Sequence, residues 1–499
     1  MISTPWKDVD LEEAECPNRE TLSDFWNRTK GKSWPTGDSW DEFYAGISNC
    51  DLYRAEDTGA VKQLLYQIAT LAIRNATQLN EGTQLKIIFT FDNGKKALFK
   101  PMRYGRHYEA DPNHFYFAEY ERHWAEIAAY HLDKVLNLRR TVPTTGRVVN
   151  LASELRPAAD AKLNKTFYFS PVGNLCVKGK CDYFCDYTNA FCGKPNLKEG
   201  SLQLWLPEED DVPRSFKLSP YRRSYNINEK EFAIWQQDQT FCEWNVTHLE
   251  RFAHGHQLLE LIQEHIFDFL TGNQDRHTMD NWKVFKENPS GFLYLDNGRA
   301  FGRPRFDDMS ILFPLTQCCV IRPSFLSTLL SYYEGQPSSL SGALYHSMNA
   351  DPVAPILSPK HYPALERRLG IVLRAVLACI ETRGAEKVIL TEFHNWNATT
   401  SSTSSSTTTT TTTTTSSTTT TTTRTSATTV SVQESEEEIK KTTASSLVKM
   451  EAAVTTTAQE SEEQIKMATA SSLVKIKAAA KTRERMEETG AEKEDDKSR

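Results

Sequence analysis

Two acidic residues, each placed just after a regular element, constrain this chain most. Residues 255–271 form an apolar run that predicts a helix, and the polar loop after it contains Asp275. Residues 292–295 form an apolar run that predicts a strand, and the Asp-Asn-Gly after it begins with Asp296. Phosphoryl transfer needs such a pair, because one carboxylate orients or deprotonates the attacking hydroxyl and another holds the metal at the nucleotide phosphates. Either loop alone could be only a turn, but convergent polar groups favour a site.

The elements upstream supply groups that would complete this site. Residues 84–100 predict a β-hairpin around an Asp-Asn-Gly turn, and Lys100 ends its second strand. The lysine could be a solvated edge residue, but a kinase places there the lysine that contacts the nucleotide phosphates. Residues 119–136 have helical apolar spacing, with Glu121 in the expected first turn and Glu126 further along. These acids could be helix-dipole partners, or they could be salt-bridge partners and metal ligands beside the lysine.

Composition divides the chain into four parts. Residues 1–80 predict an N-terminal segment that wraps the core, with a helix over residues 64–73 and an irregular stretch before it, and residues 81–395 predict one α+β domain. Residues 396–430 are almost entirely threonine and serine, which cannot bury a core and should be disordered. Residues 431–499 are charged and contain two copies of a 21-residue repeat, which are too few for a solenoid.

The cysteines and sequons indicate an oxidising compartment. Ten cysteines, an even number, fit a disulfide framework. Asn-x-Ser/Thr sequons begin at Asn27, Asn75, Asn164, Asn245 and Asn397. The N-terminus has no apolar segment typical of a signal peptide, and no run of about 20 apolar residues could span a membrane. The chain is therefore either cytosolic with reduced thiols or lacks its true start, and the second is favoured. A net charge of −7 argues against a general nucleic-acid binder.

Five segments carry a resemblance to a known family. They are ALFKPM (97–102), FYFAEYERHWAEIAA (115–129), GNQDRH (272–277), LDNGRAFG (295–302) and QCCVIR (317–322). Together they resemble the secretory-pathway kinases related to Golgi casein kinase, glycosaminoglycan xylosylkinase and four-jointed. The resemblance implies an atypical two-lobed protein-kinase-like fold of the α+β class. It has a small β-rich N-lobe, a larger helical C-lobe and disulfides, and a disordered tail follows it.

The resemblance also implies a role for each site residue. Asp275 is the catalytic acid with Asn273 in support, and Glu126 is a helix partner for Lys100. Glu121 and Asp296 hold Mn²⁺ or Mg²⁺. The implied ATP contacts are Gln84, Lys100, Gln203, Leu204, Trp205, Leu206, Asp280 and Asp296, although the run 204–206 could instead be plain core. The implied disulfides are Cys176–Cys192, Cys181–Cys185, Cys242–Cys318 and Cys319–Cys379, which leaves Cys16 and Cys50 as a fifth pair.

One position departs from the family pattern. Asp280 stands where members usually have a glutamate, which shifts a nucleotide or metal role without abolishing it. A pseudokinase member lacks the glutamate that matches Glu121, so its presence here implies an active enzyme. In the tail, Ser435 and Ser461 each begin a Ser-x-Glu motif, which makes them candidate autophosphorylation sites. A related pseudokinase or a second copy of the chain is the expected partner.

The acceptor remains open between two branches of the family. The spacing of Cys176, Cys181, Cys185 and Cys192 resembles the casein-kinase branch, which phosphorylates Ser-x-Glu in secreted acidic proteins in the Golgi lumen or after secretion. Residues 200–207 resemble the xylosylkinase branch, which phosphorylates xylose in the proteoglycan linkage region. The cysteine spacing has more weight, because it sets the covalent shape of a loop. A non-catalytic secreted scaffold is the third alternative.

Overall fold

The computed structural model describes part of the chain, and this part belongs to the first of two compact units, Met1–Ser405 and Ser406–Arg499. The described residues are 11, 19–55, 58–79, 82, 84–111, 116, 119–179, 187–224, 232–253, 256–285 and 290–390. The predictions that lie outside them concern the Thr/Ser-rich segment, the tail repeats, the tail serines, the sequon at Asn397 and the Cys181–Cys185 pair.

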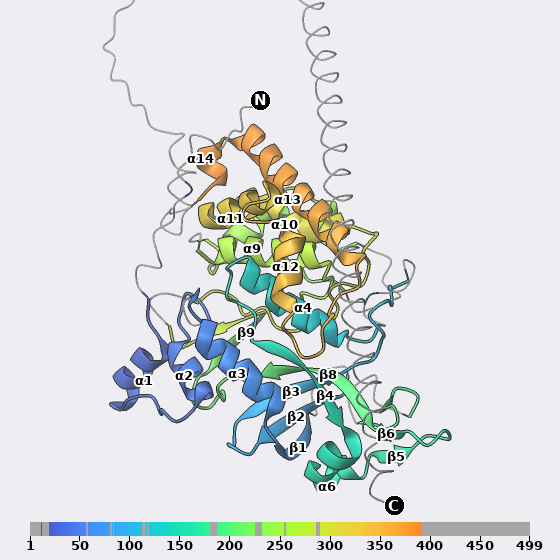
Figure 1. Ribbon diagram of the computed structural model, residues 1–499. Coiled ribbons are helices and arrows are strands. Elements are labelled where there is room, and N and C mark those ends of the chain that lie inside the picture. Colours follow the sequence, from blue (N-terminus) through green and yellow to red (C-terminus); the bar gives the residue numbers. More distant parts are fainter. Residues whose placement is uncertain are drawn as a thin grey trace, which may run out of the picture. The chain divides into compact units, whose positions relative to one another are not determined.

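A five-stranded antiparallel sheet forms one lobe of this unit (Figure 1). Its strands, in the order β1-β2-β3-β8-β4, are β1 Ile73–Leu79, β2 Lys86–Phe91, β3 Lys96–Pro101, β8 Leu197–Leu204 and β4 Thr144–Asn150. The predicted hairpin is confirmed as β2 and β3. Its turn needs Gly94, which takes φ +78°. Because β1 precedes residue 80 and pairs with β2, the sheet continues across the predicted boundary at 80.

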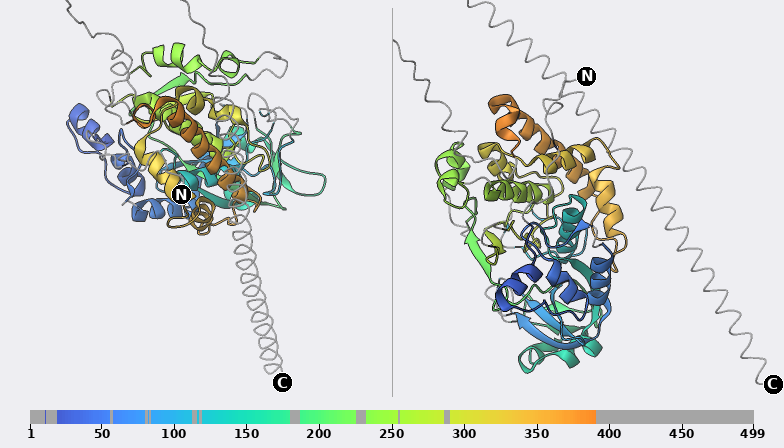
Figure 2. Two further views of the ribbon diagram at one scale, coloured as in Figure 1. Left: turned by 90° about the horizontal axis from the view of Figure 1, so that it is seen from above. Right: turned by 90° about the vertical axis from the view of Figure 1, so that its left-hand side faces the viewer.

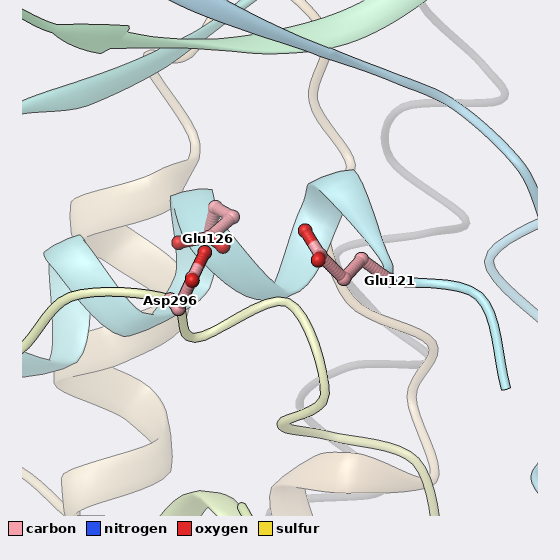
Figure 3. A group of neighbouring side chains, drawn as sticks. All are labelled: Glu121, Glu126 and Asp296. Carbon is pink, nitrogen blue, oxygen red and sulfur yellow. The ribbon is translucent and has the colours of Figure 1, made fainter. Parts of the chain in front are cut away.

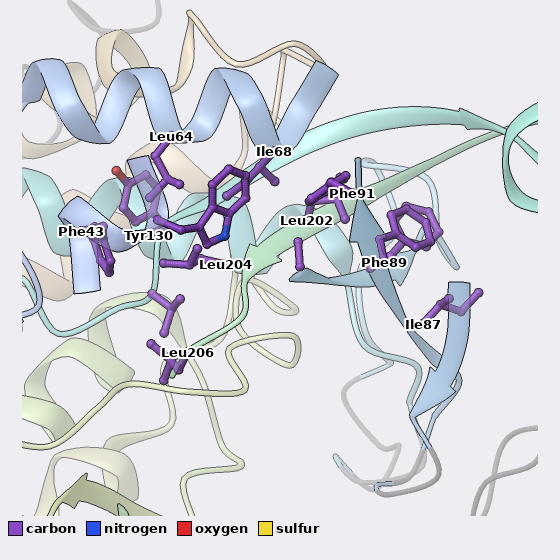
Figure 4. Close-up of a cluster of buried hydrophobic side chains, with 14 of the residues drawn as sticks. Phe43, Leu64, Ile68, Ile87, Phe89, Phe91, Tyr130, Leu202, Leu204 and Leu206 are labelled. Carbon is purple, nitrogen blue, oxygen red and sulfur yellow. The ribbon is translucent and has the colours of Figure 1, made fainter. Parts of the chain in front are cut away.

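The sheet packs in one hydrophobic core with the helix α3, Thr58–Thr70 (Figure 4). Ile87, Phe89 and Phe91 alternate along β2 and are fully buried, as expected for one face of a strand. The rings of Phe89 and Phe99 stack with their centroids 5.0 Å apart. Burial of each such side chain stabilises the fold by roughly 1.5–3 kcal/mol, so this core fixes the position of β3.

The helix predicted over residues 64–73 corresponds to α3, but the prediction of an irregular stretch before it is wrong for two segments, which are helical. They are α1, Leu22–Lys30, and α2, Ser39–Gly46. Each begins at a capping side chain: Thr21 and Asp24 form a reciprocal capping box, and Asp38 accepts hydrogen bonds from two backbone N–H groups of α2. Trp40 of α2 is fully buried, and its ring centroid lies 6.0 Å from that of Phe91. Local caps and one buried aromatic therefore order this segment.

Helices form the other lobe, and the strands of the sheet and α13 lie at opposite ends in Figure 1 and in the right-hand view of Figure 2. The helices are α4 His123–Val135, α9 His256–Thr271, α10 Phe313–Cys318, α11 Pro323–Tyr333, α12 Leu340–Met348, α13 His361–Arg383 and α14 Ala385–Val388. The predicted helix at 255–271 is confirmed as α9, which is buried from Leu258 to Thr271. None of the helices among the described residues is long and apolar enough to span a bilayer.

Shorter elements connect the two lobes and flank them. They are β5 Phe167–Phe169, β6 Leu175–Val177, β7 Phe191–Cys192, β9 Arg214–Leu218, β10 Thr278–Trp282, α5 Arg156–Ala158, α6 Ala161–Asn164, α7 Ile234–Gln237 and α8 Phe241–Trp244. A π-helical turn spans Leu151–Leu155, and 3₁₀ turns span Val246–His248 and Met309–Leu312.

Among the described residues, three of the predicted disulfides are present, one between the strands β6 and β7 and two between helices. They are Cys176–Cys192, Cys242–Cys318 and Cys319–Cys379. Cys50 is also disulfide-bonded, whereas Cys16 lies outside the described residues. The adjacent Cys318 and Cys319 tie the end of α10 to α8 and to α13, so two covalent links meet at one point of the chain.

Two local predictions are wrong. The expected strand at 292–295 forms only an isolated bridge between Leu293 and Asp280, because the chain turns there and the N–H of Leu295 donates to the carbonyl of Leu293 at 3.0 Å. The helix expected from 119 begins at His123. Glu121 therefore precedes α4, and Glu126 occupies its first turn.

Candidate active site

Lys100 lies among three carboxylates from two other parts of the chain, the start of α4 and the loop that contains Asp296. Its Nζ is 2.5 Å from Glu126 Oε1, 2.6 Å from Asp296 Oδ1 and 3.2 Å from Glu121 Oε2. The lysine comes from β3, Glu126 from α4, and Asp296 from the loop that follows Leu293. Figure 3 shows the three acidic side chains pointing toward one another. Four of the predicted site residues therefore meet in one cluster.

A second lysine, Lys86, completes the cluster and was missed in the sequence. Its Nζ lies 3.1 Å from Asp296 Oδ1 and 3.7 Å from Glu121 Oε1. The signal was available, because Lys86 stands two positions after Gln84 in the predicted strand and such residues share a face. Gln84 itself is buried; its Oε1 accepts from the N–H of Glu121 at 3.0 Å, and its Nε2 donates to the carbonyl of Glu119 at 3.2 Å. It thus holds the segment that carries Glu121, and its contact with ATP remains a prediction.

Gly298 lets the Asp-Asn-Gly loop approach the segment before α4. A Cβ built on Gly298 would lie 2.7 Å from the Cβ of Glu121, too close for any other residue without a shift. The N–H of Arg122 donates to the carbonyl of Gly298 at 2.6 Å. Asp296 takes φ +53°, a left-handed conformation that aspartate tolerates better than most residues. The loop is thus shaped to bring Asp296 and Glu121 together.

The charges of this cluster stabilise one another. The charge of Lys100 and then that of Lys86 hold the pKa of the Asp296 carboxyl well below its usual range. Burial alone would lower the pKa of Lys100, but the nearby charges of Asp296, Glu121 and Glu126 raise that pKa well above its usual value. Burial raises the pKa of Glu126 despite the nearby ammonium group. Lys100 therefore remains an ammonium and Asp296 a carboxylate at physiological pH.

The three carboxylates fit a hard divalent cation. One oxygen from each of Glu121, Glu126 and Asp296 lies within 4.8 Å of the other two. Carboxylate oxygens are the donors that Mg²⁺ and Mn²⁺ prefer. The three acids therefore have the chemistry to hold Mg²⁺ or Mn²⁺.

Asp275, in the loop that follows α9, is held both at its backbone and at its carboxylate. Asp275 Oδ2 is 2.7 Å from the Nε of Arg299, and its backbone N–H donates to Asn273 Oδ1 at 3.1 Å. Asn273 is buried and donates from Nδ2 to Asp268 Oδ1 at 3.3 Å. Asn273 therefore fixes the backbone of Asp275 against α9, while Arg299 fixes its carboxylate.

Two arginines join this loop to the loop that carries Asp296. Arg276 is buried; its Nη2 donates to Asp268 Oδ1 at 2.9 Å and to Asn297 Oδ1 at 2.8 Å. Arg299, three positions after Asp296, also donates from Nη1 to the carbonyls of Tyr116 at 2.8 Å and Glu119 at 2.9 Å. Arg299 was missed in the sequence, although it lies in the LDNGRAFG segment. One guanidinium thus links three segments of the site.

Replacement of Arg299 is expected to reduce kcat with little change in the KM for ATP. Arg299→Lys keeps the charge but cannot bind the carboxylate and two carbonyls at once, and Arg299→Gln loses the charge as well. We expect kcat to fall about tenfold in the first and about a hundredfold in the second, as for other residues that orient a catalytic group. Steady-state kinetics with a check of the melting temperature would test this order, and equal kcat in the two variants would contradict a positioning role.

The remaining predicted residues lie along β8 and β10. Gln203 and Leu204 end β8, Leu204 and Leu206 belong to the hydrophobic core, and Trp205 is half-buried. Their contact with adenine therefore remains a prediction. Asp280 lies in β10, where burial raises its pKa to about 6. The charge of Asp296 adds to this rise, so Asp280 belongs to the electrostatic surroundings of the site.

The fold and the site together define the class of atypical protein kinases. The fold has a sheet lobe and a helical lobe, and the site has a buried lysine paired with a helix glutamate, beside two acidic loops. Over residues 38–388 the chain matches the family model described as Golgi casein kinase, C-terminal, Fam20, and it belongs to this family. It is 47% identical over 392 residues to the extracellular serine/threonine protein kinase CeFam20 of Caenorhabditis elegans, a match that covers 78% of this chain and 76% of the relative.

The chain is also similar to a sugar kinase and to a solved kinase structure. The chain is 38% identical over 344 residues to the glycosaminoglycan xylosylkinase of Danio rerio, which covers 68% of this chain and 80% of the relative. The fold also matches a crystal structure of the Golgi casein kinase with Mn and ADP bound, with a TM-score of 0.73 and 47% sequence identity. This match covers 77% of this chain and 90% of the solved chain. The predicted two-lobed kinase-like fold is therefore confirmed.

Proposed function

We propose that this chain is a serine/threonine protein kinase that transfers the γ-phosphate of ATP to serines in Ser-x-Glu motifs of secreted proteins. One observation carries the proposal: a buried lysine, its helix glutamate and two further acids converge in the cluster around Lys100, next to a separately held acid, Asp275. The 47% identity to an extracellular serine/threonine kinase supports the choice of a protein acceptor. The disulfides and the relatives' names support a Golgi-lumen or extracellular location.

The residues divide the reaction between them. Asp275 accepts the proton of the serine hydroxyl as the serine oxygen bonds to the γ-phosphorus. The bond from that phosphorus to the β–γ bridging oxygen breaks, and ADP leaves. Lys100, held by Glu126, binds phosphate oxygens and keeps the nucleotide in line. Glu121 and Asp296 would hold Mn²⁺, which when bound supplies positive charge against the phosphoryl oxygens.

A side-by-side assay would test the acceptor. The purified full chain is given labelled ATP and Mn²⁺ with a Ser-x-Glu peptide, with the same peptide carrying glutamine for glutamate, and with a xylosyl-galactose acceptor. We expect label on the first peptide, at least about tenfold less on the second because one charged contact is lost, and none on the sugar. An Asp275→Asn sample controls for contaminating kinases. Label on the sugar alone would establish the xylosylkinase function, and label on no acceptor would indicate a scaffold.

A further inference from the structure

One segment of the helical lobe, residues 347–353, reaches the edge of the sheet. It contains the last residues of α12. Asp351 Oδ2 accepts from the N–H of Gly146 at 3.0 Å and from Oγ1 of Thr145 at 3.0 Å, and both donors belong to the edge strand β4. Asp351 Oδ1 accepts from the N–H of Val353 at 3.0 Å. This carboxylate therefore joins the two lobes and also orders its own segment.

The fit between this segment and β4 depends on a glycine. A Cβ built on Gly146 would lie 2.0 Å from Val353 Cγ2 and 2.7 Å from Asp351 Oδ1. Val353 is buried, so its side chain has little room to move aside. The contact between the lobes thus combines a carboxylate on one side with the absence of a side chain on the other.

The same segment contacts α4 in the second half of that helix. Ser347 Oγ lies 2.8 Å from Nδ1 of His131, which is buried. Burial lowers the pKa of His131 to about 3, so the imidazole is neutral. α12, which carries Ser347, packs beside α4 (Figure 1). This is the first of two places where residues 347–353 hold α4.

The second place is the first turn of α4, which the segment reaches through a short relay. The carbonyl of Val353 accepts from Arg106 Nη2 at 2.6 Å. The same Nη2 donates to Glu199 Oε1 at 2.6 Å. That oxygen lies 2.5 Å from Nε2 of His123, the first residue of α4. Arg106 and Glu199 therefore connect the end of the segment to the start of the helix.

Glu126, the partner of Lys100, lies between these two contact points on α4. It is three residues after His123 (126 − 123) and five before His131 (131 − 126). The two contact points are therefore eight residues apart, which is about 12 Å along a helix. A helix that is held on both sides of a residue can neither slide nor rotate freely at that residue.

We infer that residues 347–353 form a clamp that fixes α4, and that Asp351 is a positioning residue for Glu126. Glu126 Oε1 lies 2.5 Å from Lys100 Nζ, so a shift of α4 moves the group that holds the phosphate-binding lysine. A misplacement of about 1 Å can cost about 10²-fold in rate. The effect on rate rests on the proposed kinase function, whereas the ordering of α4 can be measured without any reaction.

A double-mutant cycle tests whether Asp351 acts through Glu126. Single-turnover rates are measured for wild type, Asp351→Ala, Glu126→Gln and the double variant. We expect Asp351→Ala to lower the rate about tenfold in the wild-type background but less than about twofold once Glu126 is replaced, because residues that act through one contact give non-additive losses. Asp160→Ala is the matched control and should keep the wild-type rate, because Asp160 is also half-buried and accepts the N–H of Leu163 at 2.7 Å, but in α6.

Hydrogen exchange measures the ordering of α4 without substrate. We expect the backbone amides of α4 to exchange about tenfold faster in Asp351→Ala than in wild type, with α9 unchanged as the internal reference. Gly146→Ala should have the same effect, because its Cβ would displace Val353. Gly105→Ala is its control, since nothing lies within 4 Å of the added Cβ. If Asp351→Ala does not fold, Asp351→Asn, which keeps one acceptor oxygen, takes its place.

Two results would overturn the clamp. One is unchanged exchange of α4 in folded Asp351 and Gly146 variants. The other is an equal loss of rate in both backgrounds of the cycle, which is the result expected of a merely structural residue. If the wild type transfers phosphate to no acceptor, the proposed function fails, and the exchange of α4 still decides whether residues 347–353 hold the helix.

Discussion

Replacement of Asp296 by asparagine is expected to lower kcat by about a thousandfold or more in a protein that still folds. The change removes one ligand from the set formed with Glu121 and Glu126, and it leaves Lys100 and Lys86 without the carboxylate that both contact. Charge stabilisation of the phosphoryl group is worth several kcal/mol, and each 1.36 kcal/mol corresponds to about tenfold in rate. Asparagine keeps the size of the side chain and tolerates the left-handed conformation at this position.

Two measurements would separate a metal role from a general loss. Single-turnover kinetics with saturating ATP give the rate of transfer, and electron paramagnetic resonance of free Mn²⁺ gives the affinity for the metal without any reaction. We expect weaker Mn²⁺ binding together with the lost rate. Glu381→Gln, which changes an exposed acid on α13, is the control and should match the wild type in both. Unchanged Mn²⁺ affinity in Asp296→Asn would refute its place in the metal site.

The sequence predicted the parts of the site that local patterns encode. Alternating apolar residues fixed the hairpin that ends in Lys100, and helical spacing fixed α4 with Glu126 and α9 before Asp275. Resemblance in five segments then joined these parts into one fold. The resulting contact between Lys100 and Glu126, at 2.5 Å, lies within the predicted set.

The parts that could not be predicted depend on tertiary contacts. The spacing from Gln84 places Lys86 on the same strand face as that residue, but neither Lys86 nor Arg299 has a local sequence pattern that indicates a buried ion pair. Glu121 lies outside α4 because the backbone before the helix is held by Gln84 and by Gly298, far away in the sequence. Leu293 forms an isolated bridge with Asp280 in place of a strand, which the apolar run around Leu293 could not indicate.

Replacement of Asp275 by asparagine should reduce the rate of phosphoryl transfer without the loss of Mn²⁺ binding that is expected for Asp296→Asn. We expect kcat to fall by about 10²–10⁴-fold, the usual contribution of a positioned proton acceptor. The affinities for ATP and Mn²⁺ should stay close to wild type, because the Asp275 carboxylate contacts Arg299 and does not belong to the group of acids within metal-binding distance of one another. Asparagine can still accept a hydrogen bond from Arg299 Nε through its amide oxygen, so the loop geometry should be preserved.

The comparison of the two variants is more informative than either alone. If Asp275 accepts the proton, Asp275→Asn should slow phosphoryl transfer but still bind ATP and Mn²⁺. Asp296→Asn should both slow transfer and bind ATP and Mn²⁺ more weakly. A fluorescent ATP analogue measures nucleotide binding, and rapid quench measures a single turnover. A loss of nucleotide affinity in Asp275→Asn equal to that in Asp296→Asn would show that the two acids act as one structural unit. Unequal losses follow from the structure, because Arg299 holds one acid and the two lysines hold the other.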